Sequence, residues 1–161
     1  MRSGMWLAIA LLLVTACRGP AQSPVPGPSP LQLLADQPLD QPPHTTDSVW
    51  AVVTAPQNVI DDGEGGRWVH NALYVAFVDG VPIARRQQLV DSVQARVVGG
   101  TTLGLTPLHL LVFEHLRPAP RDVALDALFK LTDGLRAHPE VKSVLTIELT
   151  PSFAPDRETN R

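Results

Sequence analysis

The 161-residue sequence contains a single cysteine, Cys17, so no disulfide can form within the chain. Its stability must therefore come from a hydrophobic core rather than from cross-links. The apolar run at residues 6–14 is shorter than the roughly 20 residues that a membrane-spanning helix needs. Basic residues are scattered, and only three Trp, one Tyr and four Phe are available for stacking on bases. This composition gives no support for a nucleic-acid partner.

Motifs of common catalytic and metal sites are also missing. No Gly-x-Ser-x-Gly nucleophile elbow accompanies Ser92, Asp91 and His109. His109 and His115 share a strand face but stand about 20 Å apart, too far for one ion. Residues 61–66 cluster carboxylates that suit a weak calcium ion, although a solvated loop is the simpler interpretation. We therefore predict that the chain is not an enzyme and uses no cofactor or metal.

The N-terminal residues have the pattern of an export signal. Arg2 precedes the apolar run, which ends in Val14-Thr15-Ala16-Cys17. These four residues resemble the lipobox of bacterial lipoproteins. The resemblance implies that a signal peptide, residues 1–16, is cleaved before Cys17, whose thiol and new amino group are then acylated. Several acyl chains suffice for stable membrane anchoring, whereas the alternative, an ordinary signal peptide, leaves an unpaired reactive thiol.

The segment after the cysteine predicts a spacer in the bacterial cell envelope. Arg18 does not resemble the acidic inner-membrane retention signal, which favours the outer membrane where the cell has one. Residues 17–46 hold half of the 16 prolines, so we expect a disordered, partly polyproline-like tether. Residues 31–35 have the composition for one marginal helical turn. Whether the length of the tether matters to function is left open.

Residues 47–150 predict one domain of alternating strands and helices. The expected strands are residues 48–54, 72–78, 95–98, 108–114 and 141–149. The expected helices run from Pro82 to about residue 94 and from a cap at Asp122 to before Pro139, with a loop at 57–67 and a turn or bulge at Gly99-Gly100. The core order is strand, helix, strand, strand, helix, strand. It predicts an α+β, ferredoxin-like βαββαβ fold, an antiparallel sheet with two helices on one face and with Phe77 and Leu128 between the two layers.

Three segments of this domain resemble the propeptide and inhibitor domains of subtilisin-like serine proteases. They are LYVAFVDG at residues 73–80, RRQQLVDSV with RVVGG at 85–100, and HPEVKSV at 138–144. The order and spacing of the segments carry the resemblance, since each one alone is short. It implies a domain that packs the open face of its sheet against a protease. The tail after the last strand then lies in the substrate cleft, and such domains inhibit the protease or assist its folding.

The tail of this chain departs from that pattern. Its protease-binding residues would be Thr150, Pro151, Ser152 and Phe153, within a polar, flexible C-terminal stretch that reaches residue 161. Pro151 and Pro155 remove backbone donors that strand pairing in a cleft uses. We therefore expect a membrane-tethered lipoprotein that binds, restrains or helps to fold an exported subtilisin-like protease. The alternative is a non-enzymatic structural or interaction lipoprotein with no protease partner.

Overall fold

A five-stranded antiparallel sheet forms the centre of the computed structural model, which describes residues 29–116 and 119–149. The strands are β1 (Val59–Asp61), β2 (Arg67–Phe77), β3 (Arg96–Leu103), β4 (Thr106–Val112) and β5 (Val141–Glu148). β2 pairs with β5 and β4, and β4 pairs in turn with β3. The order across the sheet is therefore β5-β2-β4-β3, with β1 beside the first residues of β2.

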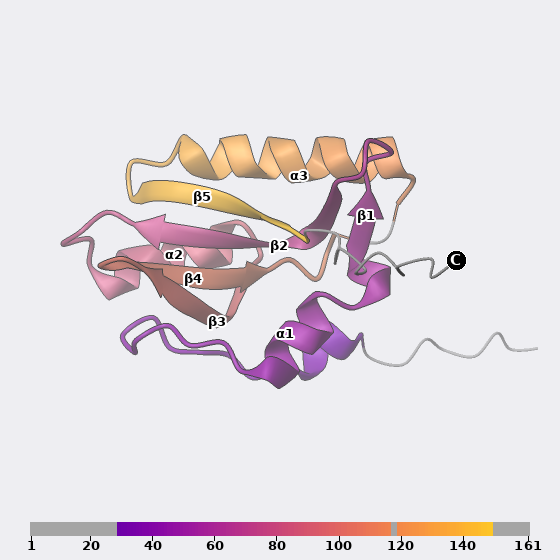
Figure 1. Cartoon of the computed structure of the whole chain (residues 1–161). Coiled ribbons are helices and arrows are strands. Elements are labelled where there is room, and N and C mark those ends of the chain that lie inside the picture. The colour runs from indigo at the N-terminus through magenta and orange to yellow at the C-terminus, as the bar shows by residue number, and fades with distance from the viewer. Residues whose placement is uncertain (1–28, 117–118, 150–161) are drawn as a thin grey trace, which may run out of the picture.

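Two helices cover one face of this sheet, α2 (Ile83–Ser92) and α3 (Arg121–Arg136). Figure 1 shows α3 lying along the sheet, on the side opposite α1 (Asp47–Val53). The core beneath the helices includes Leu73 and Phe77 of β2, Phe113 just after β4, and Leu128 of α3. The predicted α+β, ferredoxin-like arrangement is confirmed, and Phe77 and Leu128 lie between the layers as expected.

A second apolar cluster lies on the opposite side of the sheet, which we call the far face. Its elements are η1 (Pro30–Leu33), α1 and η2 (Pro56–Asn58), which precede the sheet in the chain. Leu31 of η1 and Val53 of α1 are buried there against Val69, Leu110 and other strand residues. The far face is thus partly covered, although the sequence predicted helices on one face alone.

The expected strand at residues 48–54 is wrong, because this segment forms α1. The Thr46 side chain accepts a hydrogen bond from the Val49 amide and caps the helix. Helical spacing also directs Val49, Val52 and Val53 together toward the far-face cluster. Burial of this apolar stripe outweighs the β-propensity of the valines, which is a weak preference that depends on context.

Several predicted boundaries also shift. The loop expected at residues 57–67 contains β1, which pairs with the start of β2. β3 does not break at Gly99-Gly100 but continues beyond them, with a bulge between Val97 and Gly99. Asp122 lies in the first turn of α3, whose N-cap position is Pro120, and the helix ends before Pro139 as predicted.

Candidate binding site on the far face

Residues 29–46 pack on the domain, and we call them the N-terminal strap. The Gln37 amide donates to the Val97 carbonyl at 2.7 Å, on the outer edge of β3. Leu31 is buried in the far-face cluster, whereas Leu39 is buried in the helix-side core, so the strap passes around this edge. The expected disordered tether is therefore wrong for residues 29–46, because two buried leucines and main-chain hydrogen bonds fix them.

Arg96, at the start of β3, holds the strap by its guanidinium group. Its Nε donates to the Asp36 carboxylate at 2.7 Å. Its terminal nitrogens donate to Glu114 and to the Leu34 carbonyl. The Glu114 hydrogen bond raises the pKa of Arg96, and the contact with Asp36 adds to this effect. A planar, five-donor guanidinium can satisfy such a divergent set of acceptors, and an ammonium group cannot.

Gly99 and Gly100 let the strap approach β3 closely. A Cβ atom on Gly100 would lie 2.2 Å from the Leu108 carbonyl oxygen and 2.4 Å from the Pro43 side chain. A Cβ atom on Gly99 would lie 2.7 Å from the Thr45 hydroxyl. Because neither glycine carries a Cβ atom, Thr45 can make two hydrogen bonds to the Gly100 backbone. Its hydroxyl donates to the Gly100 oxygen at 2.9 Å and accepts from the Gly100 nitrogen at 2.8 Å. The glycine pair thus serves contact between the strap and the strand.

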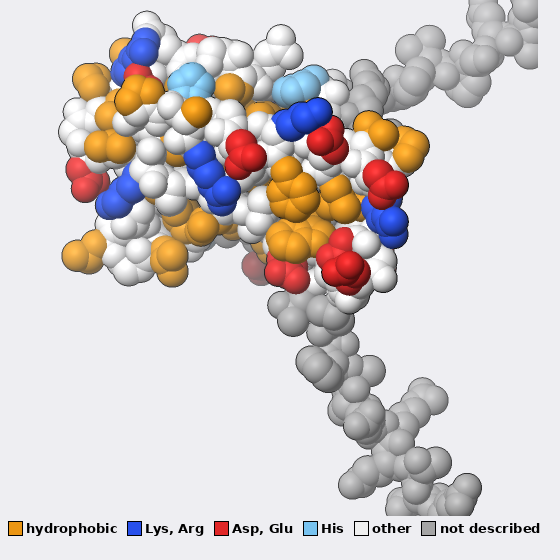
Figure 2. Space-filling view, turned by 90° about the horizontal axis from the view of Figure 1, so that it is seen from above, with side chains coloured by type: hydrophobic (Ala, Val, Ile, Leu, Met, Phe, Trp, Pro, Cys, Tyr) orange, Lys and Arg blue, Asp and Glu red, His pale blue; other side chains and the backbone are white. Residues whose placement is uncertain are grey.

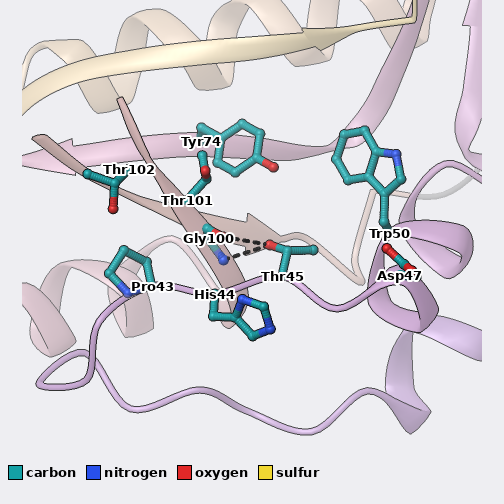
Figure 3. Close-up of a pocket in the computed structure, with 9 residues that line it drawn as sticks. All are labelled: Pro43, His44, Thr45, Asp47, Trp50, Tyr74, Gly100, Thr101 and Thr102. Carbon is teal, nitrogen blue, oxygen red and sulfur yellow. Dashed lines mark hydrogen bonds between the residues drawn. The ribbon is translucent and has the colours of Figure 1, made fainter. Parts of the chain in front are cut away.

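A pocket of about 520 Å³ opens between the strap, α1 and the sheet (Figure 3). Trp50 of α1 and Tyr74 of β2 supply its aromatic surface, and Figure 3 shows the Tyr74 hydroxyl pointing toward the side formed by Trp50. The other lining residues are polar or small: Pro43, His44, Thr45, Asp47, Gly100, Thr101 and Thr102. An aromatic pair surrounded by hydroxyls suits recognition of a ligand or protein side chain that is partly polar.

Tyr74 is the centre of the uncovered part of the far face. Burial raises the pKa of its phenol, an effect that the Thr45 side chain partly offsets, so Tyr74 is a neutral donor at physiological pH. It pairs in register with Leu145 of β5, whose side chain is 39% exposed. Trp50, at 36% exposure, lies on the other side of the pocket. We call Trp50, Tyr74 and Leu145 the far-face strip.

The residues considered for catalysis do not form a catalytic group. The Ser92 hydroxyl donates to the Leu89 carbonyl within its own helix, and Asp91 accepts from Gln87. His109 is buried against the ring of Phe77, and its Nδ1 has no hydrogen-bond partner. Burial lowers the pKa of this imidazole, and the charge of Arg86 lowers it further. His109 is therefore a buried residue of β4.

The acidic loop at residues 61–66 is occupied by its own donors. Asp62 accepts hydrogen bonds from the Glu64 and Gly66 amides and from the Trp68 indole nitrogen. The Trp68 bond is the main reason why the pKa of Asp62 is lowered. Among residues 29–116 and 119–149, no three His, Cys, Asp or Glu side chains are grouped to hold a metal ion. In the same ranges, no helix combines the length and hydrophobicity needed to cross a bilayer.

This site was not identified from the sequence, and the site residues that were predicted lie elsewhere. Cys17 and the tail residues Thr150, Pro151, Ser152 and Phe153 fall outside the described residues. The far-face strip was not predicted because residues 48–54 were expected to form a strand. In the structure Trp50 belongs to helix α1. A usable signal was the Thr46-Asp47 pair, a common helix start, which precedes three valines at helical spacing.

Comparisons of the chain with protein-family models, with curated proteins and with solved structures gave no match.

Proposed function

We propose that this chain is a lipid-anchored, non-catalytic binding protein of the bacterial cell envelope whose partner is an exported subtilisin-like protease. The observation that carries the proposal is the far-face strip, in which Trp50 and Leu145 are exposed and Tyr74 is half-buried, on the face that the resemblance assigns to protease docking. Exposed Trp and Tyr side chains are typical anchors of protein interfaces. The strand order and the placement of both main helices on the other face are consistent with this assignment.

The position of Leu149, the last described residue, supports binding of one partner to both the far-face strip and the tail. The Leu149 amide donates to the Arg67 carbonyl at 2.7 Å, and its side chain packs on the far-face cluster. The last described residue, Leu149, therefore lies on the far face together with Tyr74. A single partner can contact the strip and receive residues 150–153 in its cleft.

The strap sets this chain apart from the resembled domains. Leu31 and Val53 occupy part of the face that a protease would cover. We therefore expect a small interface, of the kind seen in weak or transient complexes. This coverage is also the observation that favours the alternative, an interaction lipoprotein with no protease partner.

The binding proposal is tested by inhibition assays with the full mature chain against several exported subtilases. We expect Trp50→Ala and Leu145→Asp each to weaken inhibition about tenfold, as loss of an interface anchor does. Removal of residues 150–161 should abolish it. The matched control is Phe129→Ala, which truncates an exposed aromatic side chain on α3, on the other face. If the wild-type chain slows none of the proteases at micromolar concentration, the protease proposal is wrong and the alternative stands.

The anchor is tested separately. Cys17→Ser should abolish lipid attachment and leave the precursor uncleaved, because the thiol is the expected acylation site. Mass spectrometry of the wild-type protein checks this directly. An unmodified mature chain that begins at Cys17 would contradict the lipoprotein assignment and leave the binding assay unaffected.

A further inference from the structure

The tip of the β3–β4 hairpin exposes two leucines. Leu103 is 65% exposed and Leu105 is 99% exposed, the largest exposure among the large hydrophobic side chains of the described residues. We call Leu103, Gly104 and Leu105 the hairpin tip. Figure 1 shows this hairpin at the end of the sheet where β3 finishes and β4 begins. Figure 2 shows hydrophobic side chains that protrude at the same end of the molecule.

The turn itself does not require leucine. Gly104 has a φ of +62° and occupies the first of two turn positions, as glycine does in type II′ hairpins. A polar residue such as Ser or Asn serves equally well at the second position, where this chain has Leu105. No protein atom outside the turn comes within 4 Å of a Cβ built on Gly104, so the tip packs against nothing there. Leu105 therefore contributes little to the folded domain itself.

The hairpin is also free of charge. No Asp, Glu, Lys or Arg occurs from Val97 to Phe113. The residues that flank the tip, Thr102 and Thr106, carry hydroxyls that can bond to lipid headgroups. Charged side chains make insertion of a loop into a bilayer surface costly, whereas leucine and threonine do not. The uncharged hairpin, with leucines at its tip and hydroxyls beside them, thus has a composition that suits contact with the interface of a membrane.

The expected anchor lies within reach of the same membrane. Arg96 donates to the Leu31 carbonyl, so the start of the strap lies beside the start of β3. The tip follows Arg96 by seven residues, or roughly 23 Å along the strand. The chain advances 12 positions from Cys17 to Ser29, and a chain of that length spans at most about 40 Å. A lipid on Cys17 and the hairpin tip can therefore meet one bilayer surface together.

We propose that the hairpin tip inserts into the surface of the bilayer that holds the anchor, with Leu105 as the deepest residue. This inference rests on the lipid anchor of the proposed function and adds a second contact to it. The two contacts orient the domain with the β3–β4 turn toward the membrane. The β1–β2 hairpin then lies at the end of the sheet that points away from the lipid (Figure 1).

The test places an environment-sensitive dye at the tip of the full acylated chain. Cys17 is consumed by acylation, so Leu105→Cys introduces the only free thiol for labelling. Lys130→Cys, on the exposed surface of α3, is the matched control. Both proteins are reconstituted into phosphatidylethanolamine–phosphatidylglycerol vesicles. We expect a blue shift and quenching by doxyl-labelled lipid at position 105 and quenching by aqueous iodide at position 130.

Two results would overturn the inference. Equal iodide quenching at both positions would mean that the tip stays in water. A blue shift at position 105 without doxyl quenching would mean contact with protein, such as a second copy of the chain. If mass spectrometry finds no lipid on Cys17, the anchor proposal is wrong but insertion of the hairpin tip can still be tested. The test is then flotation of the unacylated chain with the same vesicles. The wild type should then float more than L103S/L105S, and equal flotation would refute insertion.

Discussion

The two faces of the sheet are covered in different ways. The helix-side face is covered by α2 and α3, whose apolar residues recur at helical spacing and join one large cluster around Leu128. The far face is covered by the strap and α1, short pieces from a proline-rich segment, held by Arg96 and by Thr45 as much as by Leu31 and Val53. One layer thus depends mainly on hydrophobic area, and the other depends on a few polar contacts and a close backbone approach.

This difference predicts which changes unfold the domain and which only detach the strap. Loss of a helix-side residue should lower the stability of the whole domain, because the strands share that core. Loss of a strap contact should open a local region, since proteins unfold in parts with different free energies. The strap, which we expect to open more easily than the helix-side core, lies beside the candidate binding site.

The largest effect is expected from Leu128→Ala. Leu128 is fully buried in the helix-side core, so its truncation should lower the free energy of unfolding by about 3 kcal/mol. Urea unfolding followed by circular dichroism measures this. The neighbouring control is Phe129→Ala, which removes a half-exposed side chain from the same helix and should cost much less. Equal losses for the two variants would show that the helix is in a different register.

Gly100→Ala should come next, with a loss of about 2 kcal/mol from overpacking. The added Cβ meets the Leu108 backbone at 2.2 Å, so either the strap or β4 must move. Gly134→Ala is the matched control, because nothing lies within 4 Å of its Cβ in α3. It should stabilise the protein by roughly 0.5–1 kcal/mol, as glycine weakens a helix. A neutral Gly100→Ala would mean that neither β4 nor the strap approaches Gly100 this closely in solution.

Arg96→Ala should act mainly on the strap, with a further loss at Glu114, and cost about 1.5 kcal/mol, since charged hydrogen bonds are lost at a partly exposed site. Hydrogen exchange distinguishes the layers. The Gln37 amide, bonded to Val97, should exchange faster, while amides beneath α3 keep their protection. Arg96→Lys keeps the charge but not the guanidinium geometry, and should give an intermediate result. Faster exchange throughout the sheet would show that the strap is part of the global core.

The smallest effects are expected from pH, with opposite signs for the two faces. Burial lowers the pKa of His109 on the helix side, so the unfolded chain binds a proton first, and stability falls as the pH drops below about 6.5. Burial raises the pKa of Tyr74 on the far face, so stability falls as the pH rises above about 10. His109→Gln should reduce the pH dependence on the acid side, to which buried His70 also contributes because burial lowers its pKa as well. Tyr74→Phe should reduce the pH dependence on the alkaline side. The exposed His44→Gln is the control, and a change on the wrong side would contradict the assignment.

The fold was largely predictable because the helix-side layer follows simple periodicities. β2 and β5 are rich in apolar and β-branched residues, and α2 and α3 carry apolar residues at helical spacing, which is enough to give the order of the elements. The far-face layer was not predictable in the same way. Leu31 belongs to the short apolar stretch at residues 31–35 and Leu39 stands alone, and nothing local shows that either leucine is buried. The candidate site depends on this layer, so it was missed together with the helical state of residues 47–53.

The path of the strap has a further consequence for the open edges of the sheet. An edge strand with free backbone groups is a template for aggregation, a risk that grows when many copies share one surface. Gln37 and Thr45 occupy backbone groups of β3 at Val97 and Gly100, which closes one edge. At the other edge, the Arg136 side chain donates to the Val144 carbonyl of β5 at 3.1 Å, and Lys142 adds a charge. The same short segment that narrows the binding face therefore also protects the domain from sheet-to-sheet polymerisation.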